Sequence, residues 1–272
     1  MIDISRAAQV ALEAAHRASE VVMRVYQTPF SVDYKAKDDP VTRADREAND
    51  LICERLAAEF PKIPIVAEES LAATYAGFET ATESWFVDPL DGTREFVARN
   101  GEFAVMIGLA REGRAALGVI VAPTWRRAFV GIVGDGAWEV ARNGERNPVR
   151  VSSHPTLEGA SVLVSRSHTP PRIAELVATI RAREAVVHGS AGLKAVLVAT
   201  GARDIYLQPG PAGMRWDACA SEALVVAAGG ACTDADGNAF DYRTVDLSNA
   251  HGLVATNGLL HQPTIGALRA AR

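Results

Sequence analysis

The sequence has little of what marks secreted or membrane-spanning proteins. Only 3 of its 272 residues are cysteine. Because this number is odd and no CxxC pair occurs, the cysteines argue against a disulfide framework and indicate a reducing compartment. No run of about 18 apolar residues occurs, so we expect no membrane span. The N-terminus also lacks the basic start and apolar centre of a signal peptide. These absences predict a cytoplasmic protein.

Basic residues are not in excess either. The 28 Lys and Arg residues stand against 33 Asp and Glu residues, which gives a formal net charge of −5. Neutralising the phosphates of a duplex needs a basic face, so we do not expect a nucleic-acid polymer as partner. The 48% hydrophobic and 22% charged residues are typical of a globular protein and exclude disorder, collagen and coiled coils. The sequence leaves the oligomeric state open, and an oligomer is possible.

Hydrophobic periodicity differs between the two halves of the chain. Apolar residues at helical spacing predict helices over residues 1–26 and 42–60. Short apolar runs with glycine-containing turns then predict antiparallel strands within residues 63–140. In the second half, short strands alternate with helical segments, which is typical of an α/β layer. We therefore predict an α+β domain over residues 1–151 and an α/β domain over residues 152–272, closely packed.

The most informative segment for chemistry is WFVDPLDGT. An apolar strand runs directly into Asp88 and Asp91, with a proline between them that fixes φ and a glycine after them that permits a tight turn. Both carboxylates and the Leu90 carbonyl can then face one point, and oxygen ligands suit a hard cation such as Mg²⁺. Gly92 and Thr93 would open a helical turn whose N–H groups can hold a phosphate. The alternative is a turn whose aspartates only cap backbone groups.

Three further acidic segments each have an ordinary explanation when taken alone. Glu68 and Glu69 end an apolar run, Asp45 lies where a helix dipole favours an acid, and Asp217 is a candidate helix N-cap. Together with the first motif, these acids predict a single site. We expect cations there, because carboxylates that converge on one point repel one another unless cations compensate. Two or three Mg²⁺ ions would do so while holding a phosphate and an attacking water. The chemistry so predicted is metal-assisted phosphoryl transfer to water.

This constellation resembles the inositol monophosphatase-like superfamily of Mg²⁺-dependent, lithium-sensitive phosphatases. The resemblance covers nearly the whole chain and rests on Asp45, Glu68-Glu69, the DPLDGT motif, and Trp216-Asp217 followed by Gly229-Gly230. Ala67 departs from the pattern, because the family usually has glycine before the two glutamates. The resemblance implies a mixed α/β (α+β) fold, a layered α-β-α-β-α sandwich. Most metal ligands would lie in the first domain, Asp217 and the substrate contacts in the second, and the site in the cleft between them.

Within the superfamily, four segments resemble the 3'(2'),5'-bisphosphate nucleotidases. These segments are residues 88–110, SRSH at 165–168, the loop 189–194, and WDACASE at 216–222. The resemblance implies a place in sulfur metabolism and a small nucleotide substrate, 3'-phosphoadenosine 5'-phosphate, whose 3'-phosphate is hydrolysed to give AMP and phosphate. The alternatives are a phosphatase for inositol monophosphate or another small phosphate ester, and a non-catalytic ligand-binding protein on the same scaffold.

The resemblance also implies a role for each matching residue. The metal ligands would be Glu68, Asp88, the Leu90 carbonyl, Asp91 and Asp217. Asp45 and Thr93 would orient and activate the water, with Asp45 accepting a proton through Thr93. The nucleotide would be held by His168, Ser190 and Lys194, with the Gly92 and Thr93 amides on the scissile phosphate. Lys194 supplies a point charge for a second phosphate. Ordinary structural roles also remain open for the three residues that would hold the nucleotide: His168 as a turn cap, Ser190 as a helix N-cap and Lys194 as a solvated helix residue.

Overall fold

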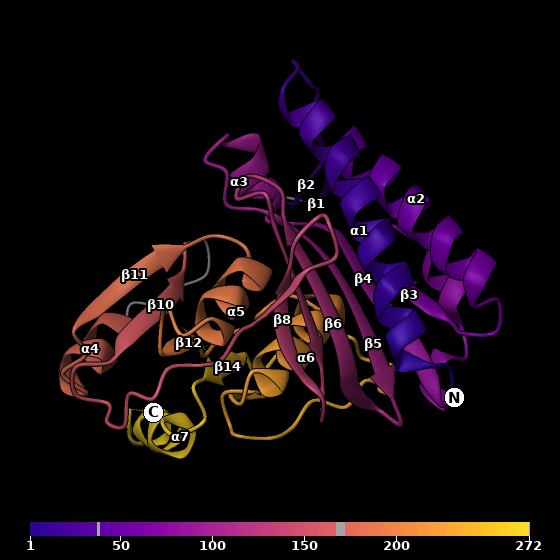
Figure 1. The fold of residues 1–272 in the computed structure, drawn as a ribbon. Helices are drawn as coiled ribbons and strands as arrows, with labels where there is room; N and C mark the ends of the chain where they lie inside the picture. The colour runs from indigo at the N-terminus through magenta and orange to yellow at the C-terminus, as the bar shows by residue number, and fades with distance from the viewer. Residues whose placement is uncertain (37–38, 167–171, 272) are drawn as a thin grey trace.

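The computed structural model describes residues 1–36, 39–166 and 172–271. This part of the chain folds into alternating layers of helices and sheets (Figure 1), in the order helices, seven-stranded sheet, helices, five-stranded sheet, helices. The α-β-α-β-α sandwich expected from the sequence is confirmed. No helix in the described ranges is long and apolar enough to cross a bilayer.

The first layer is a pair of helices, α1 (Ile4–Tyr26) and α2 (Arg43–Glu59). Asp3 caps α1, since its carboxylate accepts the N–H of Ser5 at 2.9 Å. Alanine and valine recur at helical spacing along α1, and this apolar face packs with α2 on one face of the large sheet. Between the two helices lies a short hairpin, β1 (Asp33–Ala36) and β2 (Asp39–Val41), which the polar sequence there did not indicate.

The large sheet has the strand order β3-β4-β5-β6-β7-β8-β9. Its strands are β3 (Ile65–Ala67), β4 (Glu83–Asp91), β5 (Ala104–Arg111), β6 (Arg114–Ala122), β7 (Arg127–Ile132), β8 (Gly136–Val140) and β9 (Arg146–Pro148). Consecutive strands from β4 onward are antiparallel, as predicted. The prediction was wrong for β3, which pairs parallel with β4. The chain returns through two 3₁₀ turns, η1 (Ala72–Tyr75) and η2 (Phe78–Thr80), before β4 runs in the same direction as β3.

The smaller sheet has the order β11-β10-β12-β14-β13. Its strands are β10 (Ser161–Ser165), β11 (Glu184–His188), β12 (Ile205–Gln208), β13 (Ala231–Thr233) and β14 (Leu253–Thr256). Helices α5 (Ala191–Ala199) and α6 (Arg215–Ala227) lie between the two sheets, and α4 (Arg172–Thr179) and α7 (His261–Ala270) cover the outer face. One core joins residues of both halves, so the halves pack closely. The division into two domains at residue 151 stays a prediction.

Helix α6 lies unusually close to the large sheet. Gly108, Gly118 and Gly131 are cross-strand neighbours on β5, β6 and β7, and all three face α6. A Cβ at Gly131 would lie 2.6 Å from the Cα of Leu224, and one at Gly118 would run into the Ala220 carbonyl. The three glycines therefore let the helix backbone rest on the sheet, and this contact fixes where the N-terminus of α6 lies.

Candidate active site

A β-bulge at the end of β4 aims two aspartates at one point. Asp88 pairs with Met106 on β5 and Asp91 pairs with Ala104, so β4 has one residue more than its partner between these pairs. In a regular strand, residues three apart point to opposite faces, and the extra residue cancels that alternation. Pro89 lacks an N–H, so it suits the bulge. The nearby Leu90 N–H donates to Asp88 Oδ1 at 3.0 Å.

Asp217 completes a cluster of three acids, in which Asp88 and Asp91 are buried and Asp217 is half-buried. Helix α6 begins at Arg215 with Met214 as N-cap, so the idea that Asp217 is the N-cap was wrong by three residues. Asp217 instead accepts the N–H of Met214 at 2.6 Å from the first turn of α6. Ligand oxygens of Asp88, Asp91 and Asp217 all lie within 4.8 Å of one another. Ligand oxygens around one Mg²⁺ are about 3 Å apart when adjacent and about 4.2 Å apart when opposite, so the three acids are gathered at nearly the scale of one or two cation sites.

The protein alone does not stabilise this much negative charge. Burial, followed by repulsion from Glu68, Asp217 and Asp91, raises the pKa of Asp88 well above its usual value. Burial and the charges of Asp91 and Glu68 likewise raise the pKa of Asp217 well above its usual value. A divalent cation would remove both penalties, so the donor set fits a metal ion. Because all of its donors are oxygens, it suits a hard cation.

Asp91 also connects the sheet to α5. Its Oδ1 accepts the Ala191 N–H at 3.0 Å and its Oδ2 accepts the Gly192 N–H at 2.7 Å. The Ser190 hydroxyl donates to Asp91 Oδ2 and accepts the Leu193 N–H at 3.0 Å, so Ser190 is the N-cap of α5. The helix dipole favours a carboxylate at this end.

Asp45 and Thr93 form the second functional unit. Asp45 lies in the first turn of α2, where its Oδ2 accepts the Thr42 N–H at 2.8 Å and the Thr42 hydroxyl at 2.7 Å. Its other oxygen, Oδ1, lies 3.0 Å from Thr93 Oγ1, which is also 3.1 Å from the Leu90 carbonyl oxygen. Thr93 opens the short helix α3 (Thr93–Val97), after Gly92 at φ +95°. Burial raises the pKa of Asp45.

Glu68 is less simply placed. It follows β3 and contributes to the raised pKa values of Asp88 and Asp217, yet it lies outside the three-acid cluster found among the described residues. Lys35 of β1 makes ion pairs of 2.8 Å with both Glu68 and Glu69. Burial opposes the charge on Lys35, but the two glutamates outweigh it and raise its pKa. Sequence reasoning missed Lys35, which stands in a polar segment without any motif.

Lys194 is buried in the wall of a cavity of about 290 Å³ beside these acids. Its Nζ donates to the carbonyls of Ser190 at 2.6 Å and His188 at 3.2 Å, and lies 4.9 Å from the centre of the Tyr206 ring. Burial lowers the pKa of Lys194 to about 8, although Asp91 and other acids oppose the shift. This burial excludes the interpretation of Lys194 as a solvated helix residue.

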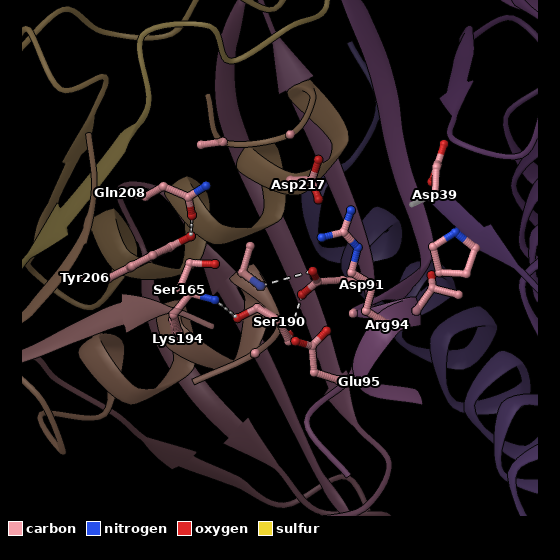
Figure 2. A pocket seen from close by; sticks show the side chains of 17 residues that line it. Asp39, Asp91, Arg94, Glu95, Ser165, Ser190, Lys194, Tyr206, Gln208 and Asp217 are labelled. Carbon is pink, nitrogen blue, oxygen red and sulfur yellow. Dashed lines mark hydrogen bonds between the residues drawn. The ribbon is translucent and has the colours of Figure 1, made fainter. Parts of the chain in front are cut away.

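Figure 2 shows the cavity between the two halves of the chain. Lys194, Tyr206 and Gln208 lie on the side of the smaller sheet, Arg94 and Asp39 lie on the opposite side, and Asp91 and Asp217 lie between them. The amide-bearing residues Gly92 and Thr93 also line it. His168 lies outside the described residues.

Sequence reasoning did not select several residues that line the cavity. They are Asp39, Arg94, Glu95, Ser165, Tyr206 and Gln208. Glu95 is buried, and burial raises its pKa. The two residues after DPLDGT were the available signal for Arg94 and Glu95. Nothing in the sequence pattern marked Tyr206 or Gln208, which are alternate residues of the short strand β12 and line the cavity.

Comparison with known proteins agrees with a metal site built from carboxylates. A family model described as "Inositol monophosphatase family" matches residues 3–271. The chain therefore belongs to the inositol monophosphatase family, whose members are metal-dependent phosphatases.

Individual relatives carry more specific names. The 3'(2'),5'-bisphosphate nucleotidase CysQ of Salmonella typhimurium is 36% identical over 85% of this chain and 91% of its own length. Among solved structures, an inositol monophosphatase from Anabaena superposes with a TM-score of 0.81 at 27% identity, covering 99% of this chain and 97% of that one. CysQ from Bacteroides thetaiotaomicron has a TM-score of 0.77 at 28% identity, covering 92% and 97%.

Proposed function

We propose that this protein is a Mg²⁺-dependent phosphatase that hydrolyses the 3'-phosphate of 3'-phosphoadenosine 5'-phosphate to give AMP and phosphate. The observation that carries the proposal is the position of Lys194, a buried cation across a small cavity from the acid cluster. A monophosphate needs only the metal site, whereas a bisphosphate has a second charge for a cation to meet. The similarity to nucleotidases named CysQ supports the same substrate class.

The metal ligands in this proposal are Asp88, Asp91, Asp217, Glu68 and the Leu90 carbonyl. Two or three bound Mg²⁺ ions would lower the pKa of a water and offset charge on the phosphate. The bulge holds Asp88 and Asp91 on one side of β4, and the closely packed α6 brings Asp217 to them from the other half.

The proton of the attacking water would pass to Asp45 through Thr93. If the Thr93 hydroxyl donates to Asp45 Oδ1, its lone pairs are left to accept from the water. The water oxygen would then form a bond to phosphorus as the bond from phosphorus to the ribose 3'-oxygen breaks, and that oxygen would take up a proton from solvent. The Gly92 and Thr93 amides at the start of α3 would hold the transferred phosphate, while Lys194 and Ser190 would position the other end of the substrate.

Comparing two substrates tests the proposal directly. We expect kcat/KM for 3'-phosphoadenosine 5'-phosphate to exceed that for inositol 1-phosphate when both are measured with Mg²⁺. A higher value for inositol 1-phosphate would overturn the substrate assignment and favour the inositol monophosphatase alternative. Absence of Mg²⁺-dependent hydrolysis of any phosphate ester would overturn catalysis itself and favour a binding protein.

A further inference from the structure

A second cavity, of about 500 Å³, lies on the α1 side of the large sheet. It shares no lining residue with the candidate active site. Its walls are the second half of α1, the ends of β6 and β7 with the turn between them, and Arg142 after β8. The volume falls within the usual range for pockets that hold small organic ligands.

The apolar part of this cavity consists of Met23, Val121, Ala122 and Pro123. Val121 packs in the core on the α1 side of the sheet and gives the cavity a fixed floor, whereas Ala122 is fully buried and its side chain packs in the core on the other side. Met23 is partly exposed, and its flexible thioether can adjust to the shape of an apolar group. This surface suits a flat or compact apolar body.

The rim of the cavity is rich in guanidinium groups. Arg126, Arg127 and Arg142 line it, and Glu20 is the acid among the lining residues. Arg127 makes two hydrogen bonds of 2.7 Å to Glu139, so its charge is matched. Arg142 meets Glu20 at 3.1 Å with 72% of its side chain exposed, which is a weak pair that an anion can replace.

Arg126 is the most available of the three cations. Its side chain is exposed and makes no hydrogen bond or ion pair with any residue that the structure describes. It sits at φ +57° in the turn closed by its N–H to the Pro123 carbonyl, a backbone region that glycine or asparagine adopts more easily. His16 on the same rim adds little positive charge, because burial and the nearby Arg142 lower its pKa and favour the neutral imidazole.

We propose that this cavity is a binding site for a small organic anion, separate from the substrate site. A phosphate, phosphonate or sulfonate group meets Arg126 and Arg142, and an apolar body rests on Met23, Val121 and Pro123. The guanidinium fork matches the oxygens of such a group. The inference rests on charge and shape at this cavity and stands whether or not the proposed substrate is correct.

Phenylphosphonate is a suitable probe, since it carries both parts of the ligand and cannot be hydrolysed by a phosphatase. Calorimetric titration of protein freed of metal ions on a chelating resin, with no soluble chelator left to compete for the arginines, leaves the active-site acids uncompensated, and these repel anions. We expect saturable binding of one equivalent with a Kd on the order of 1 mM, as befits a fragment. Benzyl alcohol, which lacks the anion, should not bind.

Variants locate the binding. Arg126→Gln combined with Arg142→Gln should weaken it about tenfold or more, because hydrogen bonds to charged groups are lost. Arg17→Gln, an exposed arginine elsewhere on α1, should leave it unchanged. Shifts of the Met23 methyl resonance should follow the titration. Absent binding, equal binding by the double variant, or closure of the cavity by a second copy of the chain at working concentration would overturn the proposal.

Discussion

Thr93 Oγ1 lies 3.0 Å from Asp45 Oδ1, although 48 residues separate the two in sequence. The contact joins the first turn of α2 to the first turn of α3, directly beside the Leu90 carbonyl. Asp45 uses its other oxygen to cap α2, so only Oδ1 is left for Thr93. One carboxylate thus fixes a helix and positions a hydroxyl.

Replacing Asp45 tests the proton path. Asp45→Asn keeps an oxygen for the α2 cap but removes the base, so we expect kcat to fall by about 10²- to 10⁴-fold. Steady-state kinetics with Mg²⁺ measure this, and the melting temperature checks the fold. The exposed Asp50→Asn on the same helix should keep its kcat. Turnover by Asp45→Asn at the level of the Asp50 control would rule Asp45 out as base.

Replacing Asp88 separates charge repulsion from metal binding. Asp88→Asn relieves a buried, mutually repelling set of acids, so the metal-free variant should melt a few degrees higher than the unmodified protein. Mg²⁺ should stabilise the unmodified protein but hardly the variant, and turnover should nearly vanish. Thermal melts with and without MgCl₂ measure both effects.

The matched control for Asp88→Asn is Asp135→Asn in the exposed β7–β8 turn, which should change neither melt. Equal Mg²⁺ stabilisation of the Asp88 variant and the control would contradict the metal assignment.

Lys194 predicts a pH dependence that differs between substrates. Its pKa of about 8 means that the free enzyme carries this charge below pH 8 and loses it above. For a bisphosphate, kcat/KM should therefore fall above about pH 8, since kcat/KM reports the pKa values of the free enzyme. For a monophosphate ester the same inflection should be absent. Lys194→Met should remove it from the bisphosphate profile and raise KM for that substrate selectively.

The outcome that contradicts the role of Lys194 is a pair of superimposable profiles. If both substrates lost kcat/KM in parallel above pH 8, or if Lys194→Met raised both KM values equally, the lysine would not select for the second phosphate.

The glycine contact under α6 predicts an indirect effect on the metal. Gly118→Ala pushes a methyl into the Ala220 carbonyl, so we expect a loss of about 1–3 kcal/mol of stability and a higher Mg²⁺ concentration for half-maximal activity. Chemical unfolding and Mg²⁺ titration of turnover measure the two effects.

Gly266→Ala is the control for the α6 contact, because it lies in α7 with nothing within 4 Å of the new methyl. It should stabilise the protein slightly, by about 0.5–1 kcal/mol, without changing the Mg²⁺ requirement. An unchanged Mg²⁺ requirement in Gly118→Ala would show that the position of Asp217 does not depend on this contact.

Local signals in the sequence predicted many of the helices and strands and the acids of the cluster, and the layered fold was implied by the resemblance that the acid motifs carry. Apolar periodicity marks α1, and a proline and a glycine around two aspartates mark the end of β4. The sequence could not show that β3 runs parallel to β4, because direction depends on the path between them. Lys35 was missed for a related reason, since its partners Glu68 and Glu69 lie far along the chain.

Other site residues were found, but with incomplete roles. The resemblance of the loop 189–194 indicated Ser190, yet the contact of Ser190 with Asp91 depends on how α5 meets β4. Burial of Lys194 likewise depends on the tertiary packing around Tyr206, which a single helix pattern does not encode. The roles proposed for the metal ligands, for Asp45 and Thr93, and for the substrate contacts, His168 among them, all stay predictions.

The row formed by Gly108, Gly118 and Gly131 has a consequence for anyone who wishes to change the ion preference of this fold. The distance between α6 and the sheet sets how far Asp217 stands from Asp88 and Asp91. Mg²⁺ demands short, regular spacing, whereas larger ions such as Ca²⁺ tolerate wider cages. Selectivity between metal ions therefore depends partly on these three glycines, and libraries aimed at new ion specificity should vary them as well as the carboxylates.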